Sequence, residues 1–287
     1  MTATITLVTC RRWPDLSASD QLYAEALRAR GCTVRAAPWN GPKTPFLETG
    51  AVVLRANWDY HHELTAFTNW LTWLEHSGVR LFNQAPLVRW NLDKRYLLEL
   101  AGAGMAVPVT RVISPDPTAV ARALQEEGWR RAVLKPTVGA SGHNVRLVEG
   151  GAEAAALADL SSSPGMAYLL QEFIPEVQAG ELSCVFFDGA FSHAFVRVPP
   201  RNEFRVNSQY GGRLMLAHPS ATVVRQARAV LDCLPDLPLY ARVDGVVRRG
   251  QFLLMELELN EPALALNLAP HAADRFAAAT VHRLHGW

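Results

Sequence analysis

Several features that would assign this chain to another class of protein are missing from its sequence. No apolar stretch is long enough to cross a bilayer, so we expect no membrane partner. The N-terminal basic residues follow the short apolar run, which reverses the order found in signal peptides. The cysteines lie far apart and form no CxxC pair, which favours reduced core thiols in a cytoplasmic protein: Cys10, Cys32, Cys184 and Cys233.

An excess of charge of one sign is also missing. The formal net charge is +1, which argues against nucleic-acid binding as the main task, and we expect no nucleic-acid partner. The chain has no internal repeats. With 287 residues, of which 49% are hydrophobic, it can bury a substantial core in two or three lobes.

The first ninety residues alternate between strand and helix patterns. Strands are predicted at residues 4–9, 33–37, 51–56 and 80–83, and helices at residues 19–30 and 64–76. This alternation predicts an open, largely parallel sheet. Ligands of such sheets bind beyond the carboxyl ends of the strands.

Polar and aromatic side chains gather at one such strand end, in RANWDYHH. Arg55 would hold a substrate carboxylate with its two-pronged guanidinium group, and Trp58, Asp59 and Tyr60 would surround a small substrate. The alternative is that Asp59 caps a helix and that the remaining residues are ordinary surface. The pattern alone does not separate the two interpretations.

A lysine followed by a glycine-rich loop suggests a phosphate site in the middle of the chain. A helix is predicted at residues 91–103, and an apolar strand at 132–136 carries Lys135 near its end. In the loop that follows, Gly139, Ser141 and Gly142 would let backbone N–H groups approach phosphate oxygens. The loop is neither a Walker A motif nor a GxGxxG fingerprint. A plain glycine-rich hairpin is the alternative.

Two further segments point to a bound nucleotide. The predicted strand 167–174 ends in Phe173 and Ile174, which would hold a purine ring beside an exposed backbone edge. Arg197 precedes the polar stretch PPRNEFRVNSQYGG, which contains Arg201, Arg205 and Asn207. Arginines clustered near a phosphate loop would neutralise charge during phosphoryl transfer. Solvated surface arginines are the alternative.

The C-terminal stretch LYARVDGVVRRGQFLLMELELNEPALA predicts a hairpin with oxygen ligands. Strands are expected at 239–247 and 251–259, with Asp244 on the first. Glu256, Glu258 and Asn260 share one face because side chains alternate along a strand. Carboxylates gathered on such a face repel each other unless a cation lies among them, and hard oxygen ligands suit Mg²⁺. A polar edge strand is the alternative.

The order of these segments resembles the ATP-grasp superfamily, and within it the bacterial glutathione synthetase type of carboxylate–amine ligase. The resemblance covers nearly the whole chain and is strongest from residue 91 to residue 267. It implies an α/β and α+β fold: a Rossmann-like domain before the grasp (1–90), a central small lobe (91–172), and a C-terminal lobe with the metal site (173–287). The last two lobes would close on ATP.

The resemblance also implies roles for individual residues. Lys94 and Lys135 match the lysines at the nucleotide phosphates, and residues 139–142 match the loop that covers them. Arg205 and Asn207 match residues near the transferred phosphoryl group. The residues that match the adenine hinge are Gln171, Glu172, Phe173 and Ile174. Glu181 matches the residue that contacts the ribose. The residues that match the Mg²⁺ ligands are Asp244, Glu258 and Asn260.

The chemistry that the resemblance implies is activation of a carboxylate by ATP and two Mg²⁺ ions to an acyl phosphate, which a nitrogen then attacks. The motif R-x-x-W-D-Y resembles the branch that includes the D-cycloserine-forming cyclo-ligase, in which O-ureido-D-serine closes on itself. A small amino-acid-like substrate would then lie among Arg55, Trp58, Asp59, Tyr60 and Arg197, and a homodimer is a possible assembly. The alternatives are a ligase that joins two molecules and a non-catalytic nucleotide-binding protein.

Overall fold

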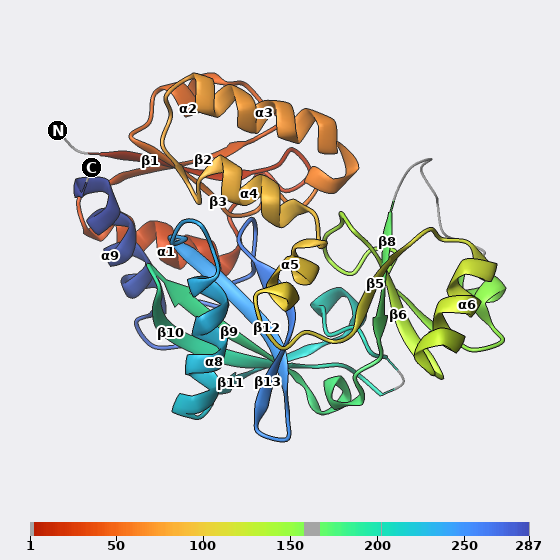
Figure 1. Cartoon of the computed structure of the whole chain (residues 1–287). Helices are drawn as coiled ribbons and strands as arrows, with labels where there is room; N and C mark the ends of the chain where they lie inside the picture. The colour runs from red at the N-terminus through yellow and green to blue at the C-terminus, as the bar shows by residue number, and fades with distance from the viewer. Residues whose placement is uncertain (1–2, 158–166, 202, 287) are drawn as a thin grey trace.

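Three β-sheets from successive parts of the chain organise the computed structural model, which describes residues 3–157, 167–201 and 203–286 (Figure 1). In that view the N-terminal sheet lies at the top, the C-terminal sheet lies at the base, and the middle sheet lies to the right of both. None of the described helices combines the length and the apolarity needed to cross a membrane.

The N-terminal sheet is parallel throughout, as predicted. Its strand order is β2-β1-β3-β4, and its strands are β1 Thr4–Thr9, β2 Thr33–Pro38, β3 Ala51–Leu54 and β4 Leu81–Phe82. β1 and β3 are buried almost completely because helices cover both faces. Those helices and one short turn of 3₁₀ helix are α1 Ala18–Ala29, α2 Thr44–Leu47, η1 Tyr60–His62, α3 Leu64–His76 and α4 Ala85–Leu92.

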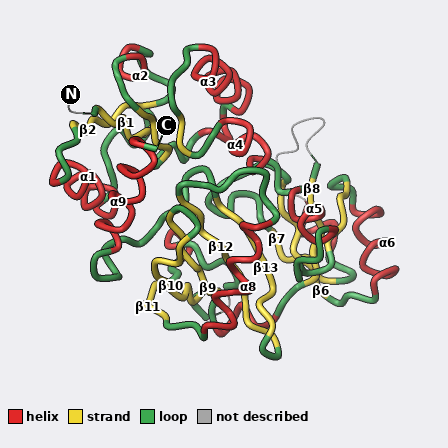
Figure 2. Tube along the Cα trace, turned by 60° about the vertical axis from the view of Figure 1, so that its left-hand side comes forward, coloured by secondary structure: helices red, strands yellow, loops and turns green. Residues whose placement is uncertain are grey.

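The C-terminal helix α9, Ala272–His285, returns to the N-terminal layer and packs beside α1 (Figures 1 and 2). The rings of Tyr23 and Phe276 stack with their centroids 3.9 Å apart, and the Tyr23 hydroxyl lies 2.7 Å from Thr280 Oγ1. Both side chains of the stacked pair are fully buried. The end of the chain therefore completes the core of the first domain.

The middle sheet is antiparallel and small. Its order is β5-β8-β6-β7, with β5 Thr110–Ile113, β6 Arg131–Pro136, β7 Arg146–Glu149 and β8 Tyr168–Glu172. The helix α6, Pro117–Glu127, begins where Asp116 accepts a hydrogen bond from Ala119 N at 2.8 Å, and its Val120 and Leu124 pack against the sheet. A short helix, α7 Glu153–Leu157, follows β7.

The single helix predicted at residues 91–103 is wrong. The chain instead forms α4 and then α5, Tyr96–Gly102, with a break at residues 93–95. The backbone N–H of Lys94 donates to Thr137 O at 2.7 Å, and Asp93 Oδ1 accepts from Arg95 N at 3.0 Å. These bonds draw the chain out of the helix and bring Lys94 next to the segment that follows β6.

The C-terminal sheet has five strands in the order β11-β10-β9-β12-β13 (Figure 2). Helix α8, Ala221–Asp232, packs against it, and the hairpin predicted at residues 239–259 is confirmed. The strands, with two 3₁₀ turns near them, are β9 Glu181–Phe187, β10 Ala190–Val198, β11 Arg213–Ala217, β12 Tyr240–Arg248, β13 Gln251–Glu258, η2 Pro175–Ala179 and η3 Ser208–Tyr210.

Side chains cover the free edge of strand β13. Asn91 donates to Leu257 O and accepts from Leu259 N, both at 2.8 Å. The Tyr96 hydroxyl donates to Leu257 O and accepts from Leu257 N, both at 2.9 Å. An unpaired edge would otherwise leave these backbone groups without partners or open to another strand. The α4–α5 segment therefore fixes β13 in place of a sixth strand.

Three of the four cysteines fit the expectation of buried thiols. Cys10, Cys32 and Cys184 are buried and free, whereas Cys233 is exposed. Cys233 is the C-terminal cap of α8, where the chain leaves the core, so the assignment of a core position to it was wrong.

Asn83 joins the first and last layers of the molecule. Its Nδ2 donates to Tyr240 O at 2.9 Å and to Leu259 O at 2.8 Å, and its Oδ1 accepts from Leu239 N at 2.6 Å. The side chain is buried, so water cannot replace these bonds.

We expect Asn83→Ala to lower the free energy of unfolding by about 3 kcal/mol, because it leaves buried backbone groups without partners. Urea titration followed by circular dichroism measures the change, with the exposed Gln125→Ala on α6 as the control. A loss below about 0.5 kcal/mol in Asn83→Ala would show that this junction is not important for stability.

Candidate functional site

A cavity of about 800 Å³ lies where the three sheets meet. It is large enough for a ligand of nucleotide size. All but two of the predicted site residues line it, and the exceptions are Asp59 and Asp244. The predicted residues that line it are Arg55, Trp58, Tyr60, Lys94, Lys135, Gly139, Ser141, Gly142, Gln171, Glu172, Phe173, Ile174, Glu181, Arg197, Arg205, Asn207, Glu258 and Asn260.

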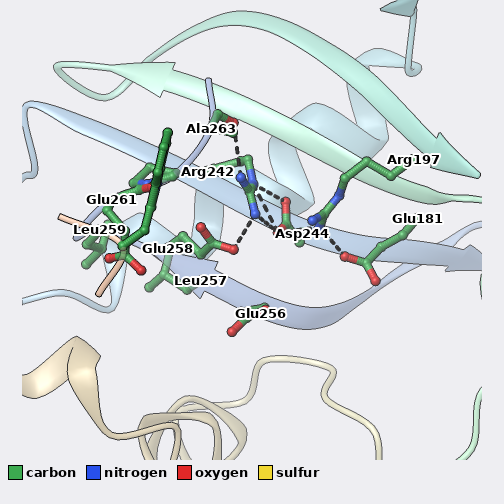
Figure 3. Close-up of polar contacts among 12 residues, drawn as sticks. Glu181, Arg197, Arg242, Asp244, Glu256, Leu257, Glu258, Leu259, Glu261 and Ala263 are labelled. Atoms are coloured by element: carbon green, nitrogen blue, oxygen red, sulfur yellow. Dashed lines mark hydrogen bonds and ion pairs between the residues drawn. The ribbon is translucent and has the colours of Figure 1, made fainter. Parts of the chain in front are cut away.

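Three carboxylates from the β12–β13 hairpin converge (Figure 3), and two of them, Glu256 and Glu258, line the cavity. Asp244 is paired in register with Glu256, and one oxygen from each of Asp244, Glu256 and Glu258 lies within 4.8 Å of the others. The strand register shifts between Asp244 and Gly245, where a Cβ atom would come within 2.4 Å of Leu253 O. A glycine is therefore required beside the metal-ligand candidate.

Arginine side chains neutralise these carboxylates. Arg242 is paired in register with Glu258, contacts that carboxylate directly, and donates to Asp244 Oδ2 at 2.9 Å. Arg197 donates to Asp244 Oδ2 at 2.6 Å and also contacts Glu181 (Figure 3). Arg242 was missed by the sequence analysis. Its two-residue spacing from Asp244 was the available signal, because it places both side chains on one face.

The pKa values of the carboxylates in this cluster are shifted in different directions. Burial raises the pKa of Glu258 to about 7, with Arg242 opposing the shift, and burial likewise raises the pKa of Glu181 to about 7 against the effect of Arg197. For Asp244, burial acts upward but Arg197 and Arg242 together lower the pKa below its usual value. Carboxylate oxygens clustered in this way are hard donors of the kind that fits Mg²⁺.

Asn260 supplies a further polar group at the same end. Its Oδ1 accepts from Asn57 Nδ2 at 3.0 Å, while its own Nδ2 and Asn57 Oδ1 are buried without partners. Unsatisfied buried amide atoms are uncommon in folded proteins. The unpartnered Nδ2 of Asn260 can donate to an oxygen of a bound ligand, whereas a metal ion would have to bind Oδ1, which already accepts from Asn57.

Two of the three lysines in the chain face this cavity. Lys94 Nζ donates to Gly139 O at 2.6 Å and lies 3.4 Å from Glu256. Lys135 Nζ donates to Gln171 Oε1 at 3.1 Å, and burial lowers its pKa to about 8. An anionic phosphate beside Lys135 would favour the charged ammonium. The donor chemistry of this part of the cavity therefore fits a polyphosphate.

The glycine-rich loop lies against η3. Gly142 has φ +68°, and a Cβ there would meet Asn207 Oδ1 at 3.0 Å and the Tyr210 ring at 3.1 Å. Tyr210 donates to Gly142 O at 3.2 Å, and Gln209 donates to Ser141 O. These contacts hold the loop over the cavity, so its backbone is close to the predicted phosphate position.

The expected adenine end is built from β8 and the residues after it. Gln171 is held by Lys135 and by Thr110 Oγ1 at 2.9 Å, and Ile174 is buried. Arg131 lies over the Phe173 ring at 4.4 Å, and Glu172 lies 3.6 Å from Arg248. Glu181, expected at the ribose, is already paired with Arg197.

The expected carboxylate-binding role of Arg55 does not fit its surroundings. The Arg55 side chain is 1% exposed, its Nε donates to Asp20 at 2.7 Å, and its Nη2 donates to Pro262 O at 2.8 Å. Burial acts to lower the pKa of Arg55, but Asp20 outweighs it, so the group stays charged inside the protein. Its guanidinium edge is used by the fold rather than left free for a substrate.

Asp59 is also turned away from the cavity. It accepts from Trp39 Nε1 at 2.7 Å and from Asn40 Nδ2 at 3.2 Å, and it makes no side-chain cap bond to η1. Asp59 is the N-cap residue of η1 by position, but its carboxylate binds Trp39 and Asn40 instead of the helix or the cavity. Trp58 and Tyr60 do line the cavity, and Trp13 joins them with its ring centroid 5.8 Å from that of Trp58.

Arg205 is held beside the loop by an acidic neighbour. It donates to Glu203 Oε2 at 2.7 Å and stacks over the Tyr210 ring at 3.6 Å. The hydrogen bonds from Arg205 lower the pKa of Glu203 to about 2. Arg205 and Asn207 therefore approach the cavity from the same short segment.

Comparison with known families assigns a class to this geometry. Residues 96–237 match the model of the ATP-grasp domain of prokaryotic glutathione synthetase, and residues 5–83 match that of the N-terminal domain of D-cycloserine synthetase DcsG. The chain belongs to the ATP-grasp ligases, enzymes that use ATP and Mg to form C–N bonds. The predicted fold class and family are thereby confirmed.

Individual relatives agree with this assignment. The cycloserine biosynthesis protein DcsG of Streptomyces lavendulae is 33% identical, with 91% of this chain and 92% of that protein aligned. The crystal structure of D-cycloserine synthetase DcsG superposes with a TM-score of 0.85 at 29% identity, covering 98% and 99% of the two chains. The ATP-grasp ligase PsnB, complexed with a phosphomimetic variant of its minimal precursor, Mg and ADP, shares the fold with a TM-score of 0.68 at 19% identity, covering 98% of each chain.

We expect Arg242→Met to lower the free energy of unfolding by about 3–5 kcal/mol, because it removes one partner of a buried ionic network. Added Mg²⁺ should recover more of the melting temperature in this variant than in the wild type, since it would then supply the missing positive charge. Arg89→Met, which breaks the half-exposed pair with Glu75, is the control and should cost at most about 1 kcal/mol. An Arg242→Met variant as stable as this control would contradict the network.

Proposed function

We propose that this chain is an ATP- and Mg-dependent ligase that closes O-ureido-D-serine to D-cycloserine. A carboxylate of the small amino-acid derivative would be activated as an acyl phosphate, and the oxygen-bound nitrogen of the same molecule would attack it with release of phosphate. Hydrolytic loss of the carbamoyl group from that nitrogen, as CO₂ and NH₃, would then give D-cycloserine. The observation that carries the proposal is one cavity that is lined by both lysines, by Glu256 and Glu258 of the carboxylate trio, by the glycine-rich loop, and by Trp58 and Tyr60. The similarity to DcsG along the whole chain supports the choice of substrate.

Asp244, Glu258 and Asn260, with Glu256 added by the structure, are the proposed holders of two Mg²⁺ ions. When bound, the ions supply Lewis-acid stabilisation of charge on the phosphate oxygens. Arg242 and Arg197 position the carboxylates. Arg242 binds Asp244 from the same strand, β12, and Arg197 binds it from β10. The metal ligands therefore do not depend on flexible loops for their orientation.

The nucleotide would lie between β8 and the glycine-rich loop. Lys94 and Lys135 would face its phosphates, and Arg205 and Asn207 would approach the transferred group from the other side of the loop. Positive charge placed in advance stabilises a phosphoryl-transfer transition state more than it stabilises the ground state. The remaining contacts proposed for adenine and ribose are those of Gln171, Glu172, Phe173, Ile174 and Glu181.

The substrate would occupy the end of the cavity nearest the N-terminal domain. Trp58 and Tyr60 supply its wall, and Arg197 is close enough to the metal ligands to face a carboxylate there. Arg55 supports this wall indirectly, because it donates hydrogen bonds to Asp20 and to Pro262 O. The loop of residues 139–142 covers the cavity and would keep water from the acyl phosphate.

The test of this function is ADP formation with purified protein, ATP, Mg²⁺ and O-ureido-D-serine. We expect ADP and a cyclised product in equal amounts without any second amine. ADP formation that depends on an added amine would instead indicate a ligase that joins two molecules. Absence of both products would overturn the proposed substrate.

Lys135→Ala is expected to lower kcat for ADP formation by at least about 100-fold, because a buried positive charge is removed from the proposed phosphate site. Lys43→Ala is the matched control, since Lys43 lies over the Trp73 ring, away from the cavity, and should retain wild-type turnover. Equal rates in the two variants would exclude Lys135 from phosphoryl transfer.

A further inference from the structure

Six carboxylates line the cavity, and five of them have a cationic partner. Asp20 pairs with Arg55 at 2.7 Å, and Glu256 pairs with Lys94 at 3.4 Å. The other three pairs join Glu172 to Arg248, Glu181 to Arg197, and Glu258 to Arg242. The sixth carboxylate, Glu261, differs because no such pair is present for it among the described residues.

The side chain of Glu261 has no hydrogen-bond or ion-pair partner among the residues that the structure describes, although it lines the cavity. Figure 3 shows it at one end of the row of carboxylates, beyond Glu258 and opposite the end occupied by Glu181. A carboxylate in a partly buried site without a counter-ion is unfavourable. The missing positive charge is therefore best supplied by what the cavity binds.

The backbone that carries Glu261 is held at five consecutive carbonyl oxygens. Each one accepts from a side chain of another element, at distances of 2.8–3.2 Å. The pairs, in chain order, are Asn260 O with the Tyr240 hydroxyl, Glu261 O with Trp58 Nε1, Pro262 O with Arg55 Nη2, Ala263 O with Arg242 Nη1, and Leu264 O with His193 Nε2.

These hydrogen bonds fix the backbone position from which the Glu261 side chain extends. The anchors come from both ends of the chain, so the position is set by the assembled fold and not by a flexible loop. A binding group whose backbone is already ordered loses little entropy when its ligand arrives. The segment of residues 260–264 therefore has the rigidity expected of a recognition element.

We propose that Glu261 is the counter-ion of the substrate's α-ammonium group, so that the site selects α-amino acids with a free amino group. This inference rests on the proposed function of the cavity. In an α-amino acid the ammonium nitrogen is only two bonds from the carboxyl carbon. A carboxylate substrate positioned at Glu258 and its neighbours would thus place its ammonium group a few ångströms away, on the side of Glu261.

The walls around Glu261 suit the same group. Trp58, which binds the Glu261 carbonyl, also lines the cavity, and Trp13 packs against it edge to face. Aromatic faces attract an ammonium cation and exclude water from its ion pair. Asp20, the other carboxylate at this end, is 2% exposed and fully used by Arg55 and the Ser17 hydroxyl.

The experiment compares two substrates in two proteins. O-ureido-D-serine and its analogue without the amino group, 3-(ureidooxy)propanoic acid, are assayed for ADP formation with wild type and Glu261→Gln. We expect wild type to prefer the amino compound by about 10- to 100-fold in kcat/KM, as a charge-assisted hydrogen bond allows. Glu261→Gln should lose most of that preference while keeping its activity on the analogue.

A purely structural role for Glu261 predicts a different result: an equal fall for both substrates. That outcome, or an unchanged preference in Glu261→Gln, would overturn the proposal. Glu25→Gln, on the exposed face of α1, is the control and should keep the wild-type preference. Equal melting temperatures and ATP affinities show that Glu261→Gln is folded.

Failure of the proposed function would be recognised separately. If wild type forms no ADP with either compound, only the assignment of O-ureido-D-serine fails. Binding of α-amino acids and their N-acetyl counterparts, in the presence of Mg²⁺ and a non-hydrolysable ATP analogue, is then measured by calorimetry. Binding that is lost on N-acetylation in wild type, and insensitive to it in Glu261→Gln, supports the role of Glu261. Binding that tolerates N-acetylation in wild type, or no binding at all, overturns it.

Discussion

The ion pairs that Arg242 and Arg197 make with Asp244 are the interaction on which the rest of the cavity depends. Asp244 is completely buried, and its neighbours Glu256 and Glu258 bring further negative charge within 4.8 Å of it. Without the two guanidinium groups the strands β12 and β13 would have to pair while their carboxylates repel each other. The same arrangement gives a divalent cation hard oxygen ligands whose orientation is already set.

The N-terminal domain and the α4–α5 segment together hold this hairpin in place. Asn83 binds the start of β12 and the end of β13, Asn91 and Tyr96 cover the free edge of β13, and Arg55 and Trp58 hold the segment that follows it. Residues that a sequence search assigns to a substrate site are thus partly used to position the metal site. The same side chains therefore connect the proposed substrate wall to the proposed metal site.

Much of the local structure could be predicted from residue patterns. Apolar residue patterns located β1, α1 and the β12–β13 hairpin. The order of the lysine, glycine loop and ELELN segments indicated the ATP-grasp class. The helix at residues 91–103 failed because its propensity was overridden by one tertiary hydrogen bond, from Lys94 N to Thr137 O. The return of α9 to α1 likewise has no local signal.

For the site, strand periodicity alone placed Glu256, Glu258 and Asn260 on one face, because that relation depends only on spacing along the backbone. The charges of Arg55, Asp59 and Arg242 could be read from the chain, but their partners could not. Asp20 lies thirty-five residues before Arg55, and Pro262 lies far beyond it. Whether a charged group faces a ligand or another side chain depends on which distant segments the packed core brings together. Only the folded molecule therefore showed that Glu261 lacks a cationic partner within the described part of the chain.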